Sequence, residues 1–159
     1  MISNRQTIKK FYTSFQQLDA ESMTALYHPE ATFEDPVFGK LNREEVVAMW
    51  QMLIERSKGN LQIEFSDIIT SEEKGTAEWI ATYLFSATNR NVRNVIQAEF
   101  EFKDGLIYKH KDTFDLWKWS KMALGWKGVL LGWSFILKNK IRSQAKNSLI
   151  KFMQKQKEV

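Results

Sequence analysis

The sequence predicts an α+β domain in which helices cover one face of a curved antiparallel sheet, followed by a helical tail. Three observations predict this arrangement. Apolar residues recur at helical spacing as far as Ile54, at alternate positions between residues 61 and 114, and at helical spacing again after Trp117. Helices followed by a run of adjacent strands are typical of a sheet with its helices on one face.

The first helix is expected to begin at a capping box formed by Ser3 and Gln6. Its apolar stripe is Ile8, Phe11, Tyr12, Phe15 and Leu18. Asp19 can cap a second, short helix that runs to about Tyr27, with Pro29 as its stop signal.

A short extended segment, ATFEDPVFG, is expected next, ended by Pro36 and Gly39. Asn42 and Glu45 have the spacing that begins a third helix. Its core stripe is Val46, Met49, Trp50, Leu53 and Ile54.

Alternating apolar residues then predict four long strands joined by short turns, including an Asp104-Gly105 hairpin. The strands are expected at residues 61–69, 76–87, 94–102 and 106–114. The inward face is expected to carry Ala77, Trp79, Ala81, Tyr83, Phe85, Asn94, Ile96, Ala98, Phe100 and Phe102. Alternation of small and large side chains there suggests a sheet that curves around a cavity. The opposite face carries charged residues together with the apolar Ile80, Leu84 and Val95. Such a mixture suits partial cover by a second subunit, so a homodimer through the sheet is expected.

Charge divides the 159-residue chain into two parts. Residues 1–117 hold 13 Lys and Arg against 18 Asp and Glu, a net charge of −5, and are expected to form the domain. Residues 118–159 hold 10 Lys and Arg against Glu158 alone, a net charge of +9, and are expected to form a basic extension that begins with a helix capped by Asp115.

The spacing of apolar residues in the extension predicts an amphipathic helix over residues 126–157, which also carries several lysines. The stripe is Trp126, Leu130, Trp133, Leu137, Ile141, Ala145, Leu149 and Phe152. Two interpretations stay open: the helix packs on the domain or on a partner subunit, or it binds an anionic membrane surface. Nucleic-acid binding is disfavoured because no recognised binding fold accompanies the charge.

Composition excludes several chemistries. With no cysteine there is no disulfide, no thiolate zinc site and no cysteine nucleophile. His28 and His110 lie far apart and match no metal-ligand spacing, so we expect no metal, and no Gly-rich phosphate loop points to a cofactor. The N-terminus resembles no signal peptide and no run of ~18 apolar residues could span a membrane, so a cytoplasmic location is expected, with peripheral membrane attachment through the tail as the alternative.

The stretch LYHPEATFEDPVFG, residues 26–39, together with the order of elements, resembles the ketosteroid isomerase branch of the NTF2-like (SnoaL-like, cystatin-like) superfamily over roughly residues 3–117. The resemblance implies a conical pocket with Asp35 as the general base. The positions of the two oxyanion donors fall on Phe11 and Ala98, and Tyr12 lies about 100° further around its helix. Because losing one such donor costs on the order of 10²–10³ in rate, ordinary steroid isomerisation is not expected.

The stretch IYKHKDTFDLW, residues 107–117, could supply the missing polar groups. On a strand His110, Asp112 and Phe114 share one face. Polyketide cyclases of the SnoaL-like type similarly place an acid on this late strand, which implies that Asp112 is a general acid or base and that His110 donates to an enolate oxygen or tunes Asp112. The alternative is a structural His–Asp pair, or a strand whose faces are reversed.

The remaining candidates would contact a ligand. Tyr83 and Asn94 are candidate donors on inward faces, and Trp50 and Trp79 would wall a flat apolar compound. Tyr12 and Phe114 complete the predicted binding set. Two functions therefore stay open: proton-transfer catalysis on a small apolar carbonyl or cyclic compound without a cofactor, or non-catalytic binding of an apolar ligand.

Overall fold

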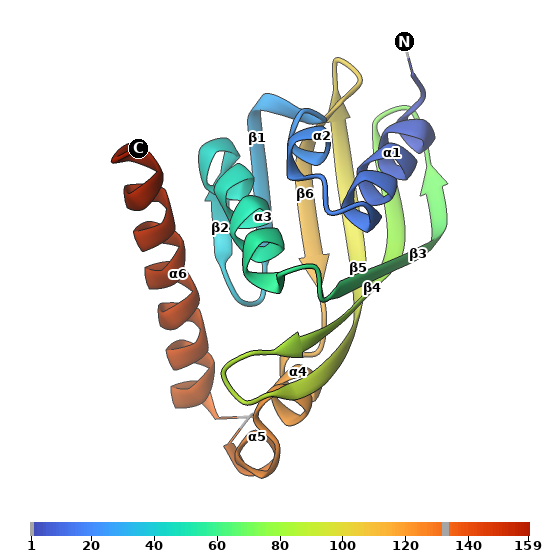
Figure 1. Cartoon of the computed structure of the whole chain (residues 1–159). Helices are drawn as coiled ribbons and strands as arrows, with labels where there is room; N and C mark the ends of the chain where they lie inside the picture. The colour runs from blue at the N-terminus through green and yellow to red at the C-terminus, as the bar shows by residue number, and fades with distance from the viewer. Residues whose placement is uncertain (1, 132–133) are drawn as a thin grey trace.

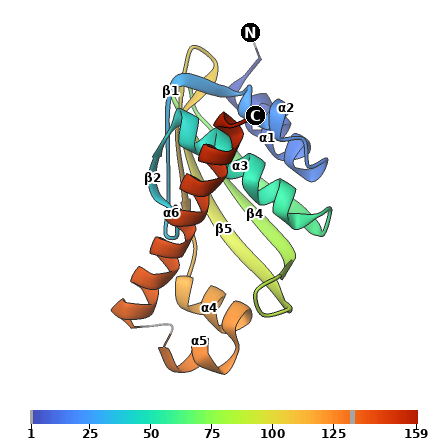
Figure 2. The same ribbon diagram turned by 60° about the vertical axis from the view of Figure 1, so that its left-hand side comes forward.

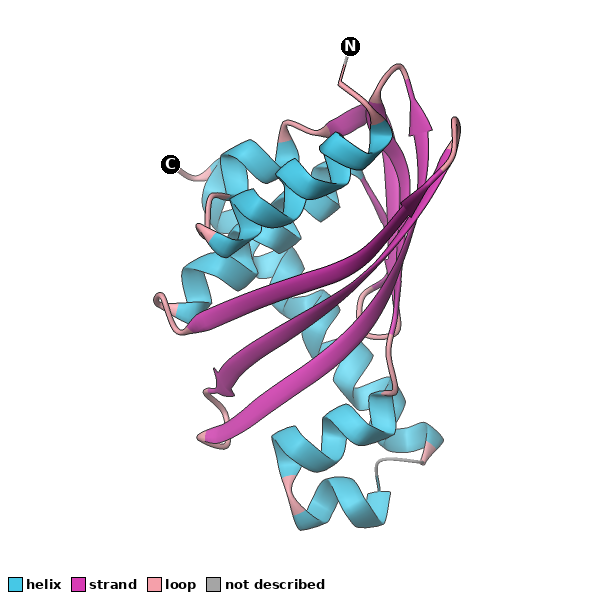
Figure 3. Ribbon diagram, turned by 90° about the vertical axis from the view of Figure 1, so that its right-hand side faces the viewer, coloured by secondary structure: helices cyan, strands magenta, loops and turns pink. Residues whose placement is uncertain are grey.

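A computed structural model describes residues 2–131 and 134–159, and shows a curved open sheet with helices against its concave face (Figures 1 and 3). The helices are α1 Asn4–Gln16, α2 Ala20–Thr24, α3 Arg43–Ser57, α4 Leu116–Leu124, α5 Trp126–Leu131 and α6 Phe135–Lys157. The strands are β1 Tyr27–Asp35, β2 Gly39–Asn42, β3 Leu61–Thr70, β4 Lys74–Phe85, β5 Arg90–Lys103 and β6 Leu106–Thr113. The predicted α+β fold with an added C-terminal helix is confirmed.

The six strands lie in the order β2-β1-β6-β5-β4-β3. The four predicted strands form an antiparallel meander, in which β5 and β6 are joined through the two-residue Asp104-Gly105 turn, where both residues have positive φ. The sheet is not antiparallel throughout, because β1 pairs with β6 in parallel and with β2 antiparallel. This pairing places the end of β1 beside the end of β6.

The helices begin at the capping residues that the sequence indicated. Ser3 and Asn42 each accept from the backbone three residues on, and Gln6 and Glu45 complete the two capping boxes. Asp115 accepts from the Lys118 N–H at the start of α4.

The predicted end of the second helix was wrong. Helix α2 ends at Thr24, and Tyr27 is already the first residue of β1. Pairing with two neighbouring strands outweighs the short helical pattern in this stretch. Pro29 lies inside β1, in the stretch between Tyr27 and Thr32 where the β1–β6 register shifts, so its missing N–H is tolerated there.

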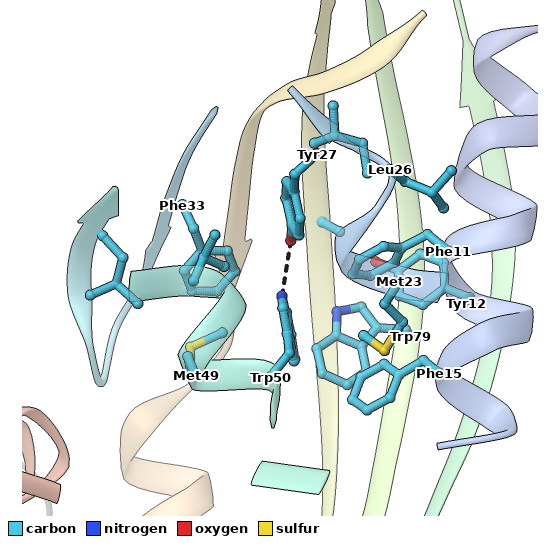
Figure 4. Close-up of a cluster of buried hydrophobic side chains, with 14 of the residues drawn as sticks. Phe11, Tyr12, Phe15, Met23, Leu26, Tyr27, Phe33, Met49, Trp50 and Trp79 are labelled. Carbon is cyan, nitrogen blue, oxygen red and sulfur yellow. Dashed lines mark hydrogen bonds between the residues drawn. The ribbon is translucent and has the colours of Figure 1, made fainter. Parts of the chain in front are cut away.

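Aromatic side chains pack the space between α1, α3 and the sheet (Figure 4). Phe11, Tyr12 and Tyr27 are at most 2% exposed, and the ring of Phe11 makes edge-on contacts with the rings of Tyr12, Tyr27 and Trp50. The closed end of the expected cone is therefore filled by protein side chains. A hollow of about 670 Å³ lies instead on the outer face of the sheet, lined by alternating Lys and Glu side chains.

The C-terminal extension packs onto the domain through α6. Leu149 is buried in the main core, and Ala145, Phe152 and Met153 pack against the same core. Helix α6 runs beside α3 (Figures 1 and 2). The predicted division at residue 117 and the homodimer stay predictions, and Trp133 of the expected stripe lies outside the described residues.

Candidate functional site

A chain of hydrogen bonds crosses the aromatic core from α3 to the sheet. Trp50 Nε1 lies 3.0 Å from the Tyr27 hydroxyl, which lies 2.7 Å from His110 Nδ1. His110 Nε2 is 2.9 Å from Asp112 Oδ1, and Trp79 Nε1 is 3.3 Å from the same oxygen. The first contact is drawn in Figure 4. These five side chains, Trp50, Tyr27, His110, Asp112 and Trp79, are called the buried relay below.

The two indole donors in the buried relay have a defined direction. An indole N–H can only donate, so the Tyr27 oxygen accepts from Trp50 and Asp112 Oδ1 accepts from Trp79. A carboxylate oxygen can only accept, so His110 Nε2 donates to Asp112 Oδ1, and His110 Nδ1 is hydrogen-bonded to the Tyr27 hydroxyl. His110 is therefore held between a phenol and a carboxylate.

Burial makes this pair chemically unusual. The His110 side chain is 0% exposed and that of Asp112 is 3% exposed. A buried carboxylate is tolerated when N–H groups point at it, and His110 and Trp79 both donate to Oδ1. Asp112 lies directly opposite Ala98 in the β5–β6 pair. The small alanine side chain leaves room for an acidic group on the neighbouring strand.

Tyr12 is a second unusual polar group in this core. Its hydroxyl is buried and has no hydrogen-bond partner among the described residues. Burial, together with the nearby Asp112 charge, raises the pKa of Tyr12 well above its ordinary value. The same two influences raise the pKa of Tyr27, against a lowering by its hydrogen bond from Trp50. Both phenols therefore stay protonated.

Asp35 ends β1 at the rim of the core. Its Oδ1 accepts from the N–H groups of Val37 at 2.9 Å and Phe38 at 2.6 Å, so the turn uses only one carboxylate oxygen. Burial, its largest influence, raises the pKa of Asp35 to about 7, and the charge of Asp112 acts in the same direction. The two backbone donors and Arg142 oppose this rise. Asp35 is a carboxyl group that changes protonation near neutral pH.

Predicted ligand-binding residues gather at the same rim. Phe114 and Tyr83 pack against both the main core and a smaller cluster under α4. Tyr83 accepts a 2.7 Å hydrogen bond from Trp119 Nε1 on α4, and Asn94 is buried on β5. From α6, Arg142 Nε donates to the Pro36 carbonyl at 2.8 Å. Helices α4 and α6 therefore cover the end of the core at which Asp35 lies.

The predicted residues thus fall into two groups. His110, Asp112, Trp50 and Trp79 are joined in the buried relay, while Asp35, Tyr83 and Phe114 lie toward the rim. In the described part of the chain no hydrogen bond joins Asp35 to His110 or Asp112, and the Asp112 charge is the link between the groups.

Three residues that contact the candidate site were not predicted from the sequence. Tyr27 was assigned to the end of a helix, although its place inside the family-like stretch of residues 26–39 was a usable signal. Trp119 and Arg142 lie in the extension, and their contacts with Tyr83 and Pro36 depend on tertiary packing. No local pattern could have indicated them.

The curved sheet with helices in its concavity is shared with several solved structures. An epoxide hydrolase of the LEH-like type from M. tuberculosis is 18% identical, with a TM-score of 0.60 over 80% of this chain and 92% of that one. IdmH from Streptomyces antibioticus, a proposed polyketide cyclase, is 19% identical, with a TM-score of 0.62 over 72% of this chain and 93% of that one. TerC, crystallised with polyporic acid, is 14% identical, with a TM-score of 0.66 over 77% of this chain and 98% of that one.

The curved sheet with helices in its concavity is the fold of an NTF2-like α+β protein. The sequence model of the SnoaL-like domain matches residues 8–110, and the chain belongs to this family. A sequence search of curated proteins finds no match.

Proposed function

We propose that the chain is an enzyme that transfers a proton on a small apolar carbonyl or cyclic compound, with Asp35 as the base. The observation that carries this proposal is the pairing of two carboxylates at one apolar core, one at the rim with a pKa near 7 and one fixed inside. A base whose pKa is close to the working pH is well suited to proton transfer. The similarity to small-molecule enzymes such as the epoxide hydrolase adds support at the level of the family.

Asp35 is the carboxylate that a substrate can reach. It is partly exposed, whereas Asp112 is 3% exposed and its Oδ1 is occupied by two N–H donors. Oδ2 of Asp35 is not used by the turn and can accept a proton from a ligand placed against Phe114 and Tyr83. In this arrangement the side chains at the rim orient the ligand and Asp35 moves the proton.

Asp112 and His110 have a supporting role in this proposal. The negative charge of Asp112 raises the pKa of Asp35 and thereby its strength as a base. His110 holds Asp112 in place through the 2.9 Å contact and is itself oriented by Tyr27. The mechanism requires neither metal nor cofactor, since every proton moves between protein and substrate.

Ordinary steroid isomerisation is not part of the proposal. The two positions at which the resemblance implies oxyanion donors hold Phe11 and Ala98, which are 0% and 1% exposed and apolar. Charge that develops on a substrate oxygen must be met by other donors, and Tyr83 and Asn94 are the candidates near the rim.

Deuterium uptake from heavy water into a panel of cyclic ketones and enones tests the proposal, because it detects proton abstraction directly. Asp35→Asn keeps an oxygen that can accept from Val37 and Phe38, so the turn should survive. We expect exchange to fall by about 10²–10⁴ in this variant. Glu34→Gln is the matched control, since Glu34 lines the outer hollow and should leave exchange unchanged. Full exchange in Asp35→Asn would refute the role of Asp35.

A second function is favoured by the packed interior and by the apolar side chains at both oxyanion positions. In that case the chain binds an apolar compound at the rim without converting it. Saturable binding that is equal in wild type and Asp35→Asn, with no exchange across the panel, would favour this function over catalysis.

A further inference from the structure

Helix α5 and the start of α6 lie at one end of the molecule (Figures 1 and 2). They carry large apolar side chains that are exposed to solvent. Trp126 is 69% exposed, Val129 50%, Leu130 60%, Phe135 75% and Ile136 80%. These five residues are called the end patch below. Exposed apolar side chains on neighbouring segments are typical of surfaces that interact with a partner or a membrane.

Close packing of α5 explains why its apolar residues face solvent. Gly128 lies against α4 so closely that a Cβ there would be 2.0 Å from the Ser120 carbonyl oxygen. A glycine therefore forms the inward face of α5, and Trp126, Val129 and Leu130, spaced by three and four positions, are exposed.

Helix α4, against which α5 packs, is held to the turn between β4 and β5. Arg90 Nε donates to the Met122 carbonyl at 2.9 Å, and the Thr88 hydroxyl donates to the Ala123 carbonyl. Gly125 has the positive φ of 65° that ends α4 and begins the turn into α5. The β4–β5 turn thus fixes the α4–α5 pair, and the exposure of α5 is built into the fold.

Basic side chains accompany the end patch. Residues 116–157 contain no Asp or Glu, and Lys118, Lys121, Lys127, Lys138 and Lys140 lie on or beside the three helices. The ammonium of Lys121 is 3.9 Å from the Trp117 ring and that of Lys127 is 5.8 Å from the Trp126 ring. Aromatic and lysine side chains in one surface are suited to the boundary between lipid headgroups and acyl chains.

The predicted amphipathic stripe is divided by the structure. From Ile141 onward its apolar residues pack on the domain, with Leu149 buried in the core. Trp126 and Leu130 at its start are exposed, as are Phe135 and Ile136 beside the stripe. No helix in the described parts of the chain is long and apolar enough to cross a bilayer.

We propose that the end patch binds the surface of an anionic lipid bilayer, with its aromatic and aliphatic side chains among the headgroups and the lysines on lipid phosphates. The end patch lies on a projecting end of the molecule, which suits a flat surface (Figure 1). The lysines on or beside α4, α5 and the start of α6, with no Asp or Glu in residues 116–157, are complementary to an anionic membrane. This proposal is independent of the proton-transfer chemistry at Asp35.

Co-sedimentation of the full chain with phosphatidylcholine vesicles, with and without phosphatidylserine, tests the proposal. We expect binding to vesicles that contain phosphatidylserine and little binding to phosphatidylcholine alone. Each lysine near an anionic surface contributes about 1 kcal/mol to binding. Because each 1.4 kcal/mol corresponds to about a tenfold change in affinity, the double variant Lys127→Ala/Lys138→Ala should weaken binding about thirtyfold. Lys155→Ala/Lys157→Ala is the matched control, because it removes the same charge from the other end of α6.

Apolar variants separate insertion from charge attraction. Trp126→Ser and Ile136→Ser change exposed side chains, so circular dichroism and thermal unfolding should stay as in wild type while binding falls at least tenfold. Absence of binding to anionic vesicles overturns the proposal, as does equal loss in the two double-lysine variants with no effect of the serine variants. Self-association that the serine variants abolish, in a chain that does not bind vesicles, would assign the end patch to a second copy instead.

Discussion

Two tryptophans in this molecule have opposite surroundings. Trp50 is 2% exposed, touches the rings of Phe11, Phe15 and Phe33, and donates its N–H to Tyr27. Trp126 is 69% exposed on α5. The same residue type therefore stabilises the fold in one region and forms part of a candidate docking surface in the other.

The contrast extends to the polar groups around them. In the core, the donors of the buried relay are matched to acceptors, whereas the buried Tyr12 hydroxyl has no partner among the residues that the structure describes. Beside the end patch Lys118, Lys127 and Lys140 are exposed and Lys121 and Lys138 are half-buried. The core thus holds groups whose loss should cost stability, and the end patch holds groups whose loss should cost binding.

Truncating the two tryptophans gives the largest expected difference. Trp50→Ala should lower the free energy of unfolding by about 3–5 kcal/mol, because it leaves a cavity and an unpaired Tyr27 hydroxyl. Trp126→Ala should change it by less than about 0.5 kcal/mol. Urea unfolding followed by circular dichroism measures both. Similar losses in the two variants would show that α5 contributes to stability and would remove the contrast.

The next largest effect is the pH dependence introduced by Asp35. A carboxyl group with a folded-state pKa of about 7, against an ordinary 3.8, stabilises the fold below pH 4 and loses that contribution as pH rises to 7. The Asp35→Asn variant has no carboxyl group to ionise, so its stability does not fall for this reason. The free energy of unfolding of the variant minus that of wild type should therefore increase from pH 4 to pH 8, by up to about 4 kcal/mol.

Unfolding curves at a series of pH values test the Asp35 effect. A constant difference between the variant and wild type would mean that Asp35 is already ionised at acidic pH. The base proposed for proton transfer would then be a weak one.

Tyr27→Phe tests the buried relay at an intermediate size of effect. The change removes one hydroxyl and leaves Trp50 Nε1 and His110 Nδ1 without that partner, which should cost about 1–3 kcal/mol. Tyr12→Phe is the matched control, since its hydroxyl is buried without a partner and its removal should be neutral or stabilising. Equal destabilisation by both changes would argue against a connected relay.

Local patterns predicted most of the elements. Capping residues at Ser3, Asn42 and Asp115 and the period of two after residue 61 placed helices and strands near their observed positions. The same alternation correctly placed His110 and Asp112 on the inward face. What a residue does within its own element can be read from its neighbours in the sequence.

Contacts between distant segments could not be predicted in this way. The parallel pairing of β1 with β6 turned the expected helix end at Tyr27 into a strand and brought its hydroxyl to His110. The filling of the cone depends on how far α1 and α3 approach the sheet, which no local pattern specifies. The roles of Asp35, His110 and Asp112 stay predictions, because a fold of this kind supports many chemistries.

The smallest predicted effect joins the extension to the candidate site. Arg142 donates to the Pro36 carbonyl at 2.8 Å, and its charge lowers the pKa of Asp35 against the effect of burial. Arg142→Ala should therefore raise the pKa of Asp35 further, while stability changes by less than about 1 kcal/mol because the side chain is exposed.

Carboxyl NMR titration of Asp35 measures this shift directly, and Lys146→Ala, an exposed cation one turn further along α6, is the control. An upward shift in the arginine variant alone means that α6 tunes the base while the end patch remains free for lipid. If neither variant changes the titration, α6 stabilises the fold without acting on Asp35, and the two regions are electrostatically separate.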